Sequence, residues 1–455
     1  MHVVRPPVDG RGAVGEGVLM PGPGALSPAT EAALFADAGL ARGADGVLRL
    51  GGVALAEVAD AVGTPAFAYN ADAIRARYRA LAGALGDLPH RIHFAVKANS
   101  NLAVLRVLRD LGAGADIVSE GEMRRALAAG FAAEAIVFSG VGKTADELRA
   151  AVRAGLGHVN VESTAELERL GEIAEEEGRD VSVGIRVNPD VTTDTHPYIS
   201  TGKSGIKFGV PTDQVLPAAA FIRRHPRLAL TAVAMHLGSQ ILDPAPYGEG
   251  IERLRELVER LRADGTDTIR AVDIGGGLGI RYAEEPALDL EAYARTVVPR
   301  LRPLGLTVYL EPGRFLVGSA GVLLATVLYR KHSGGKGFVV LDAGMNELVR
   351  PSRYQAYHAI VELAARGRPA ETVDVVGPVC ETGDFLALDR TLPAVEAGER
   401  VAVLGAGAYG FVMSSNYNTR PLPAEVLVDG GRFALARPRQ VAEQLFRDEN
   451  PTPFD

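Results

Sequence analysis

The stretch His93-Phe94-Ala95-Val96-Lys97-Ala98-Asn99 is short, apolar and bounded by polar residues, which predicts a buried β-strand. Lys97 does not suit this environment, because a buried ammonium group is unfavourable unless it is paired or chemically altered. A desolvated lysine has a lowered pKa, and its neutral amine can form a Schiff base with a carbonyl group. The alternative is a structural lysine whose head group reaches solvent at the strand end. Other parts of the sequence have to decide between a Schiff-base lysine and a structural lysine.

Outward from this strand, strand-like and helix-like segments alternate along the chain. Strand-like runs are predicted at residues 93–98, 115–119, 135–139, 158–162, 181–187, 232–236, 271–274 and 307–310. Helix-like segments separate most of them, such as 103–111, 120–129, 145–154, 164–177 and 247–263. Eight strand–helix units within about 250 residues are what an α/β fold of the (β/α)8 TIM-type barrel class requires. A doubly wound parallel sheet is the alternative fold.

Beyond Phe315 the pattern changes to strand-like runs separated by Gly, Pro and Asp turns. These runs are residues 322–328, 338–341, 372–376, 400–404 and 424–428, with one helical stretch at 357–365. The pattern predicts a second, mainly β C-terminal domain. We therefore expect four parts, namely a flexible N-terminal extension (1–28), a segment packing with the β domain (29–62), the barrel (63–314) and the β domain (315–455).

Composition excludes several classes of protein. With 455 residues, 47% of them hydrophobic and 23% charged, the chain fits a soluble globular enzyme of about two domains. Its net charge of −8 argues against binding to nucleic acid or to a membrane surface, and no apolar run is long enough to span a bilayer. The single cysteine, Cys380, rules out an intrachain disulfide and fits the reducing cytoplasm. The stretch up to Ser27 lacks the pattern of a signal peptide.

The predicted strand ends carry polar groups, and in a TIM-type barrel the functional groups lie at the C-terminal ends of the strands. They are Lys97 after the first strand, His236 and Ser239 after the sixth, Gly275-Gly276-Gly277 after the seventh and Glu311-Pro312-Gly313-Arg314 after the eighth. A lone histidine is more often a core residue, but the position of His236 beside Ser239 at one strand end favours a functional role.

The glycine run is a poor dinucleotide-binding fingerprint, because Ile280 stands where the third glycine should fall. It suits backbone N–H groups that approach a phosphate after strands seven and eight, although a tight turn without ligand would also explain it. Considered by themselves, Glu311 and Arg314 could form a structural ion pair that needs no ligand. Taken with Lys97, these groups indicate an aldehyde cofactor that carries a phosphate, pyridoxal 5'-phosphate, whose ring nitrogen a carboxylate keeps protonated. We predict no metal site.

The predicted β domain holds a further polar cluster. Cys380 lies beside Glu381 and close to Asp384, between turn residues, which is a poor context for packing in a core. Arg350 and Tyr409 add polar groups from neighbouring segments, and each would be an ordinary surface residue if it stood alone.

In combination these motifs resemble the fold type III pyridoxal-phosphate-dependent decarboxylases, which have an alanine racemase-like barrel, and specifically the diaminopimelate decarboxylase family. The resemblance runs from about Gly51 to Arg439. The matching segments are 94–99, 188–191, 195–196, 201–209, 236–240, 273–279, 311–314, 345–354, 377–390 and 409–420. Residues 203–206 and 352–353 depart from the family pattern.

The resemblance implies a role for each matched residue. Lys97 would be the Schiff-base lysine, His236 would stack on the cofactor ring and Glu311 would contact the pyridine nitrogen. The remaining cofactor contacts would be Ser239, Gly275, Gly276, Gly277, Pro312, Gly313, Arg314 and Tyr409. The substrate contacts would be Arg314, Arg350, Tyr354, Glu381 and Tyr409, with Cys380 as the catalytic proton donor. The resemblance also implies a homodimer with shared active sites, in which Cys380 and Glu381 come from the partner subunit.

The implied function is decarboxylation of meso-2,6-diaminopimelate to L-lysine and CO2, the last step of lysine biosynthesis. The planar guanidinium groups of two arginines suit the distal carboxylate of this substrate, and Glu381 suits its ammonium. A decarboxylase of ornithine, lysine or arginine would instead favour acidic residues there. An alanine-racemase-like enzyme would carry an arginine at the pyridine nitrogen. A non-catalytic pyridoxal-phosphate carrier would lack the β domain, and an inactive homologue would lack the lysine or the proton donor.

Overall fold

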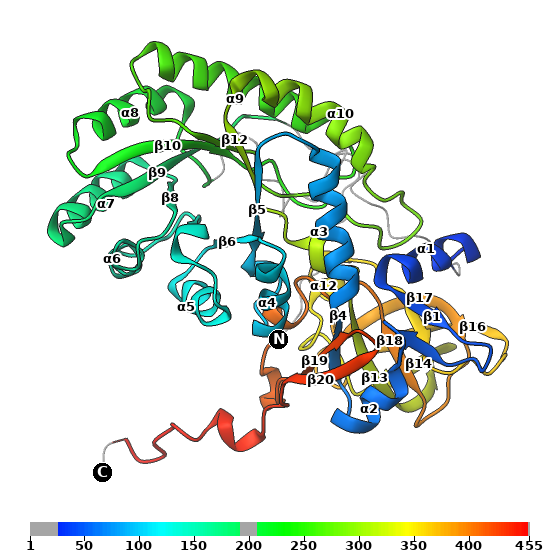
Figure 1. Ribbon diagram of the computed structural model, residues 1–455. Coiled ribbons are helices and arrows are strands. Elements are labelled where there is room, and N and C mark those ends of the chain that lie inside the picture. Colours follow the sequence, from blue (N-terminus) through cyan, green and yellow to red (C-terminus); the bar gives the residue numbers. More distant parts are fainter. Residues whose placement is uncertain (1–25, 192–206, 454–455) are drawn as a thin grey trace, which may run out of the picture.

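Eight parallel strands close into a barrel in the computed structural model, which describes residues 26–191 and 207–453 (Figure 1). In chain order they are β5 (His90–Ala95), β6 (Gly114–Ile117), β7 (Ile136–Phe138), β8 (His158–Val161), β9 (Val181–Val187), β10 (Leu228–Met235), β11 (Ala271–Asp273) and β12 (Thr307–Leu310). Each pairs with the next, and β12 pairs with β5 to close the ring. The predicted barrel is confirmed, and the doubly wound sheet is excluded.

In the described chain, eight helices surround the barrel, and several of them begin and end at residues typical of helix caps. They are α3 (Ala71–Leu85), α4 (Leu102–Asp110), α5 (Glu120–Ala129), α6 (Ala145–Ala154), α7 (Thr164–Glu177), α8 (Val215–Arg224), α9 (Ala245–Ala263) and α10 (Leu290–Leu301). At the start of α6, Thr144 and Glu147 form a reciprocal capping box, and Gly155 ends the helix in the left-handed conformation. Such an N-terminal cap contributes about 1 kcal/mol. Leu148 and Val152 of this helix face the core.

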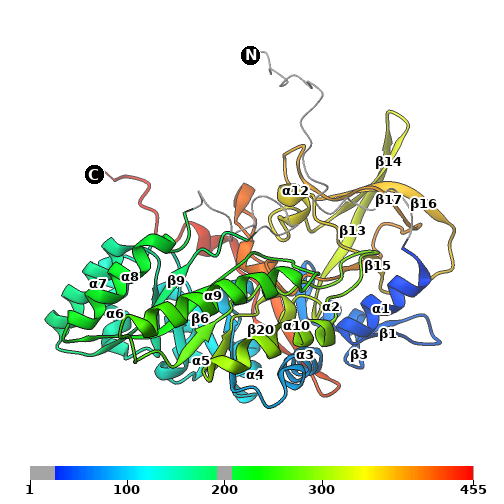
Figure 2. The same ribbon diagram turned by 90° about the horizontal axis from the view of Figure 1, so that it is seen from above.

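The second domain is built around a nine-stranded sheet, seen beside the barrel in Figures 1 and 2. Its strands are β4 (Ala66–Asn70), β13 (Gly321–Ser333), β14 (Lys336–Leu341), β15 (Ile360–Glu362), β16 (Ala370–Val376), β17 (Phe385–Pro393), β18 (Arg400–Val403), β19 (Ala424–Asp429) and β20 (Arg432–Arg437). Three short helices lie at its margins, namely α11 (Arg314–Val317), α12 (Arg350–Tyr354) and the one-turn η8 (Ala442–Leu445). The predicted mainly β domain is confirmed.

The N-terminal part of the described chain packs on this second domain. It comprises α1 (Pro28–Ala38), β1 (Leu40–Arg42), β2 (Leu48–Leu50), β3 (Val53–Ala54) and α2 (Leu55–Val62). Buried Leu48 and Leu55 share one apolar cluster with Val322 and Val426 of the sheet. We keep the four-part division of the chain as a proposal, with one addition. β4, inside the range 63–314 assigned to the barrel, pairs with β13 and β19 of the second domain.

Three local predictions are wrong. The helix expected at 357–365 is absent from that described segment, and strand β15 lies there because the β-branched Ile360 and Val361 pair with β18. Strands β17 and β20 were not predicted from the sequence. Lys97 does not lie within a strand, because β5 ends at Ala95 and the chain turns through the one-turn helix η1 (Val96–Ala98). The matched segment 195–196 and residues 201–206 of the matched segment 201–209 lie outside the described residues, as do residues 1–25 of the proposed extension.

Candidate active site

Lys97 meets a carboxylate at the C-terminal end of the barrel. Its Nζ donates to Asp116 Oδ2 of β6 at 2.8 Å, and the lysine side chain is 36% exposed whereas that of Asp116 is fully buried. Burial lowers the pKa of Lys97, but the carboxylates of Asp116 and Glu311 outweigh it, so the pKa is raised overall. The predicted lowering of this pKa is therefore wrong for the chain without cofactor, because buried anions surround the amine.

Three buried carboxyl groups lie at this end of the barrel, from β6, β11 and the loop after β12. Burial raises the pKa of Glu311 well above its ordinary value, and the charges of Asp116 and Asp273 raise it further. Burial likewise raises the pKa of Asp273 to about 6. Glu311 Oε1 accepts a hydrogen bond from Ser139 Oγ at 3.2 Å. Both pKa shifts disfavour the charged forms of these carboxyl groups, so a cationic group placed among them would restore their charge and be stabilised.

The glycine run brings the ends of β10, β11 and β12 into close contact. A Cβ atom on Gly276 would lie 2.1 Å from the carbonyl oxygen of Glu311, and one on Gly277, whose φ is +92°, would lie 2.4 Å from that of Gly238. No larger residue fits either position. Gly276 N donates to His236 Nδ1 at 3.2 Å, and burial lowers the pKa of this histidine, so the ring is neutral.

Backbone donors remain available beside these glycines. Over residues 26–191 and 207–453, the N–H groups of Gly277 and Gly313 donate no hydrogen bond. They follow β11 and β12, the two strands after which TIM-type barrels bind phosphate. Ser239 Oγ, at the end of β10, accepts from Arg314 Nη2 at 3.2 Å. The carboxyl groups, the Lys97 amine and these donors therefore fit pyridoxal phosphate.

Two buried arginines both contact Tyr282. Arg314 Nη1 donates to the hydroxyl of Tyr282 at 2.6 Å, and the guanidinium carbon of Arg350 lies 4.5 Å from the centre of the same ring. Arg350 Nη1 bonds to His358 Nε2 at 2.7 Å, while His358 Nδ1 donates to the carbonyl of Leu404. Each arginine is 7% exposed, and within the described chain neither forms an ion pair with a carboxylate.

Burial changes the pKa values of Arg350 and of its partner His358. It lowers the pKa of Arg350 to about 10, although the nearby tyrosines Tyr282, Tyr409 and Tyr354 act in the opposite direction. It also lowers the pKa of His358 well below its ordinary value, so that this ring is neutral and its Nε2 accepts from the arginine. A cation pair buried without its own anion is a binding site for an anion.

The second domain also contributes to the barrel end. Tyr409 N donates to the carbonyl of Ala98 at 2.9 Å, and the ring of Tyr409 lies 4.9 Å from the guanidinium carbon of Arg314. Tyr354 lies in α12 with Arg350, and its hydroxyl accepts from Arg353 Nε at 3.2 Å. The structure thus brings these predicted residues together with Lys97 and the glycine run. The carbonyl of Pro312 accepts from Ala95 N, which fixes the strand end before Lys97.

Cys380 and Glu381 are the predicted site residues that this single chain does not bring to Lys97. Both are exposed, and Cys380 N donates to Asn418 Oδ1 at 2.9 Å. Their loop is nevertheless well anchored, since Asp384 accepts from Met345 N and Val379 N at 2.6 Å each. The contacts found for the two residues within the described ranges are with the second domain.

Sequence reasoning missed Asp116, Tyr282 and His358. The signal for Asp116 existed, because it lies in a predicted barrel strand beside that of Lys97. Tyr282 follows the glycine run, where only the run itself was considered, and His358 was assigned to a helix. No group of three His, Cys, Asp or Glu side chains in the described ranges has a metal-binding arrangement, and no described helix is long and apolar enough to cross a membrane.

Comparison with known proteins gives consistent matches. Residues 71–318 match the family model of the pyridoxal-dependent decarboxylases, pyridoxal binding domain. A diaminopimelate decarboxylase of Pseudomonas aeruginosa is 49% identical over 402 residues, 88% of this chain and 96% of the relative. One of Vibrio cholerae is 44% identical, over 90% and 98% of the two chains. The crystal structure of the Helicobacter pylori diaminopimelate decarboxylase complexed with L-lysine superposes with a TM-score of 0.83, at 39% identity over 86% of this chain and 98% of that one.

Proposed function

We propose that this chain, which belongs to the diaminopimelate decarboxylases, a family of pyridoxal-dependent enzymes, decarboxylates meso-2,6-diaminopimelate to L-lysine. Bound pyridoxal 5'-phosphate supplies an aldehyde for an amine and a ring that accepts the electron pair left by the departing carboxylate. Lys97 is the amine that holds the cofactor. Gly277, Gly313 and Ser239 would hold its phosphate, and Glu311 would pair with its ring nitrogen.

The surroundings of Lys97 support this assignment. Asp116 fixes the position of Nζ, and the buried carboxyl groups around it favour a cationic ring nitrogen beside Glu311. His236 is neutral and held by Gly276 N, so it adds an uncharged flat surface for the ring.

The single observation that carries the choice of substrate is the pair of buried arginines without a carboxylate partner. Arg314 and Arg350 both contact Tyr282, and within the described residues each lacks the anion that a buried guanidinium needs. Diaminopimelate brings that anion as its distal carboxylate. An ornithine- or lysine-type substrate has only an ammonium at its distal end, which two guanidinium groups would repel.

The second half of the site comes from another copy of the chain. Cys380 and Glu381 are exposed on an anchored loop, the state expected of side chains that a partner subunit covers in a homodimer. Glu381 of that copy binds the distal ammonium, and its Cys380 Sγ delivers the proton to the carbon that has lost its carboxylate. Tyr354 and Tyr409 line the path between the two halves. A free thiol with this role suits the reducing cytoplasm, where we expect the enzyme to act.

The test is a comparison of substrates. CO2 release should be measured from meso-diaminopimelate, L-lysine, L-ornithine and L-arginine at equal concentrations. We expect diaminopimelate to exceed the other three by at least about 10³-fold in kcat/KM, because they leave buried charges unpaired. Comparable turnover of lysine or ornithine would contradict the proposed role of the arginine pair.

A further inference from the structure

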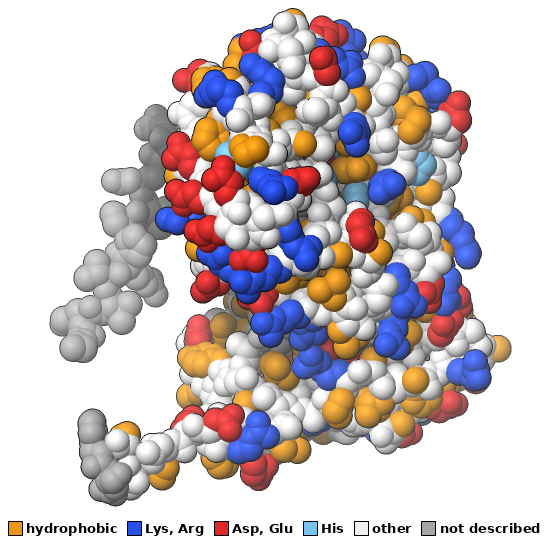
Figure 3. Space-filling view, turned by 60° about the vertical axis from the view of Figure 1, so that its left-hand side comes forward, with side chains coloured by type: hydrophobic (Ala, Val, Ile, Leu, Met, Phe, Trp, Pro, Cys, Tyr) orange, Lys and Arg blue, Asp and Glu red, His pale blue; other side chains and the backbone are white. Residues whose placement is uncertain are grey.

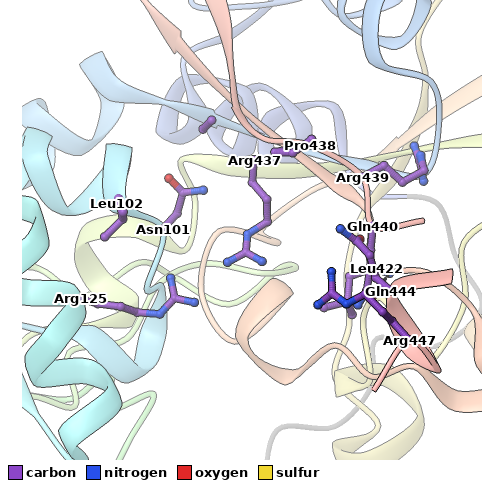
Figure 4. A pocket seen from close by; sticks show the side chains of 11 residues that line it. Asn101, Leu102, Arg125, Leu422, Arg437, Pro438, Arg439, Gln440, Gln444 and Arg447 are labelled. Atoms are coloured by element: carbon purple, nitrogen blue, oxygen red, sulfur yellow. Dashed lines mark hydrogen bonds between the residues drawn. The ribbon is translucent and has the colours of Figure 1, made fainter. Parts of the chain in front are cut away.

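A cavity lies away from the proposed active site, between the barrel and the C-terminal segment of the chain (Figure 4). Its volume is about 570 Å³, and it is bounded by the beginning of α4, by α5 and by the segment from the end of β20 to η8. The lining includes Asn101, Arg125, Arg437, Arg439, Gln440 and Arg447. None of the described residues that line it is acidic, and none belongs to the proposed active site.

The positive charge of this cavity, which we call the arginine cavity, is only partly compensated. Arg437 Nε pairs with buried Glu425 at 3.0 Å, and exposed Arg447 pairs with its neighbour Asp448 at 3.4 Å. Arg125 and Arg439 have no such partner in the described chain. They donate instead to the backbone carbonyls of Ser100, at 3.0 Å, and Pro65, at 2.8 Å.

The arrangement of the guanidinium groups suits one compact anion. In Figure 4, Arg125 extends from the barrel side and Arg437 from the opposite side toward the same space, with Gln440 and Gln444 at its edge. On the face drawn in Figure 3, Lys and Arg side chains gather along the hollow between the upper and lower parts of the molecule. Planar guanidinium groups bind phosphate oxygens in pairs, which makes arginine a preferred phosphate ligand.

We propose that the arginine cavity binds a phosphorylated small molecule, with Arg125 and Arg437 holding the phosphate. The volume lies within the range of about 300–1,000 Å³ typical of small-molecule sites and exceeds what a single phosphate needs. The remaining space is lined by the amides of Gln440 and Gln444, which can hydrogen-bond an uncharged remainder.

The cavity is connected to the segment that carries Lys97. Arg125 holds the carbonyl of Ser100, and Asn101 caps α4 by accepting from Ala103 N at 2.9 Å while its own N–H donates to Asn99 Oδ1. A ligand on Arg125 and Asn101 therefore contacts residues that directly follow η1. This contact gives the cavity a physical route to the active site, but binding itself is the property to test.

The experiment is calorimetric titration of the cofactor-saturated enzyme in a buffer free of phosphate, so that the active-site phosphate position is occupied. Pyrophosphate is the probe, with citrate as a polycarboxylate of similar charge. We expect one pyrophosphate per chain and at least tenfold weaker binding for Arg125→Gln. Arg124→Gln is the matched control, because Arg124 precedes Arg125 in α5 but is 76% exposed and does not line the cavity. This control should bind as the wild type does.

A second variant guards against misfolding. Arg447→Glu changes a side chain that is 68% exposed, so the fold should tolerate it, and it should weaken pyrophosphate binding by a similar factor. Absence of binding to the wild type, or equal binding by Arg125→Gln, would overturn the proposal. So would equally tight binding of citrate, which would make this a general polyanion site. Conversion of dimers to monomers by Arg125→Gln and Arg447→Glu would also overturn it, because the cavity would then be an interface between copies.

Discussion

The barrel end and the Cys380 loop contribute to one proposed site in opposite ways. At the barrel end, Lys97, Arg314 and Arg350 are held by short contacts among buried groups, so this half is formed within one chain. The Cys380 loop is equally well anchored through Asp384. Within the described residues, however, the side chains of Cys380 and Glu381 make no contact with the barrel end. Under the proposed function, one chain would complete the binding of cofactor and distal carboxylate, whereas proton delivery would need a second copy.

The largest expected effect is at Lys97, in the preformed half. Lys97→Ala should lower kcat by more than about 10³-fold, because no other amine can hold the cofactor aldehyde. The visible absorbance of the purified enzyme should disappear, while far-ultraviolet circular dichroism should be unchanged. Borohydride reduction of the wild type should attach the chromophore to Lys97, as read by peptide mapping. Attachment to another lysine would place the cofactor elsewhere.

The next effect concerns the exposed half. Cys380→Ala should lower kcat by about 10²–10⁴-fold, the usual contribution of a positioned general acid, with little change in KM. Cofactor absorbance should be retained, in contrast to Lys97→Ala. An unchanged kcat would remove the proton donor from this loop and with it the functional reason for a second copy.

The arginine pair tests how completely the barrel end is preformed. Arg350→Ala should lower kcat/KM for diaminopimelate by about 10²-fold, since the distal carboxylate loses a buried charged partner. His358→Ala should act in the same direction by about tenfold, mainly through KM, because His358 positions Arg350 without touching the substrate. Arg366→Ala, in the same domain but at a side chain that is 59% exposed and outside the site, is the control and should be silent. Equal effects of all three variants would indicate general destabilisation of the second domain.

The smallest effect concerns stability and the barrel interior. Burial lowers the pKa of His93 to about 3 and that of His158 to about 4. Because their folded-state pKa values lie below the ordinary 6.5, the unfolded chain binds protons first, and stability is lost as pH falls below 6.5. Between pH 6.5 and 5.5 the loss should be about 1 kcal/mol per histidine. Urea unfolding of His158→Phe should show a shallower pH dependence than the wild type, whereas exposed His332→Gln should not.

Much of the fold was predictable because the barrel repeats one strong pattern. Buried parallel strands such as β7, Ile136-Val137-Phe138, read as continuous apolar runs, and helices such as α6 carry complete capping signals. The second domain was less predictable, because its short strands depend on partners far away in the sequence. Ile360 and Val361 form a strand only because β18 lies beside them, and β4 reaches its partner β13 about 250 residues later.

The candidate site likewise contains residues that could be predicted from the sequence and residues that could not. Lys97, the glycine run and Glu311 were recognised because each follows a predicted strand. Tyr282 and His358 could not be found from the sequence, because their importance lies in contacts with Arg314 and Arg350 that only the folded chain creates. The raised pKa of Lys97 likewise depends on carboxylates brought in from other strands.

The measurement that tests the shared site most directly is complementation between two inactive variants. Lys97→Ala and Cys380→Ala proteins should be mixed under conditions that exchange subunits, and heterodimer formation should be verified by mass. Random pairing makes half of the dimers mixed, each with one intact site, so activity should recover to about a quarter of the wild-type value. Absence of recovery in proven heterodimers would place both residues in the same chain's site and contradict the account.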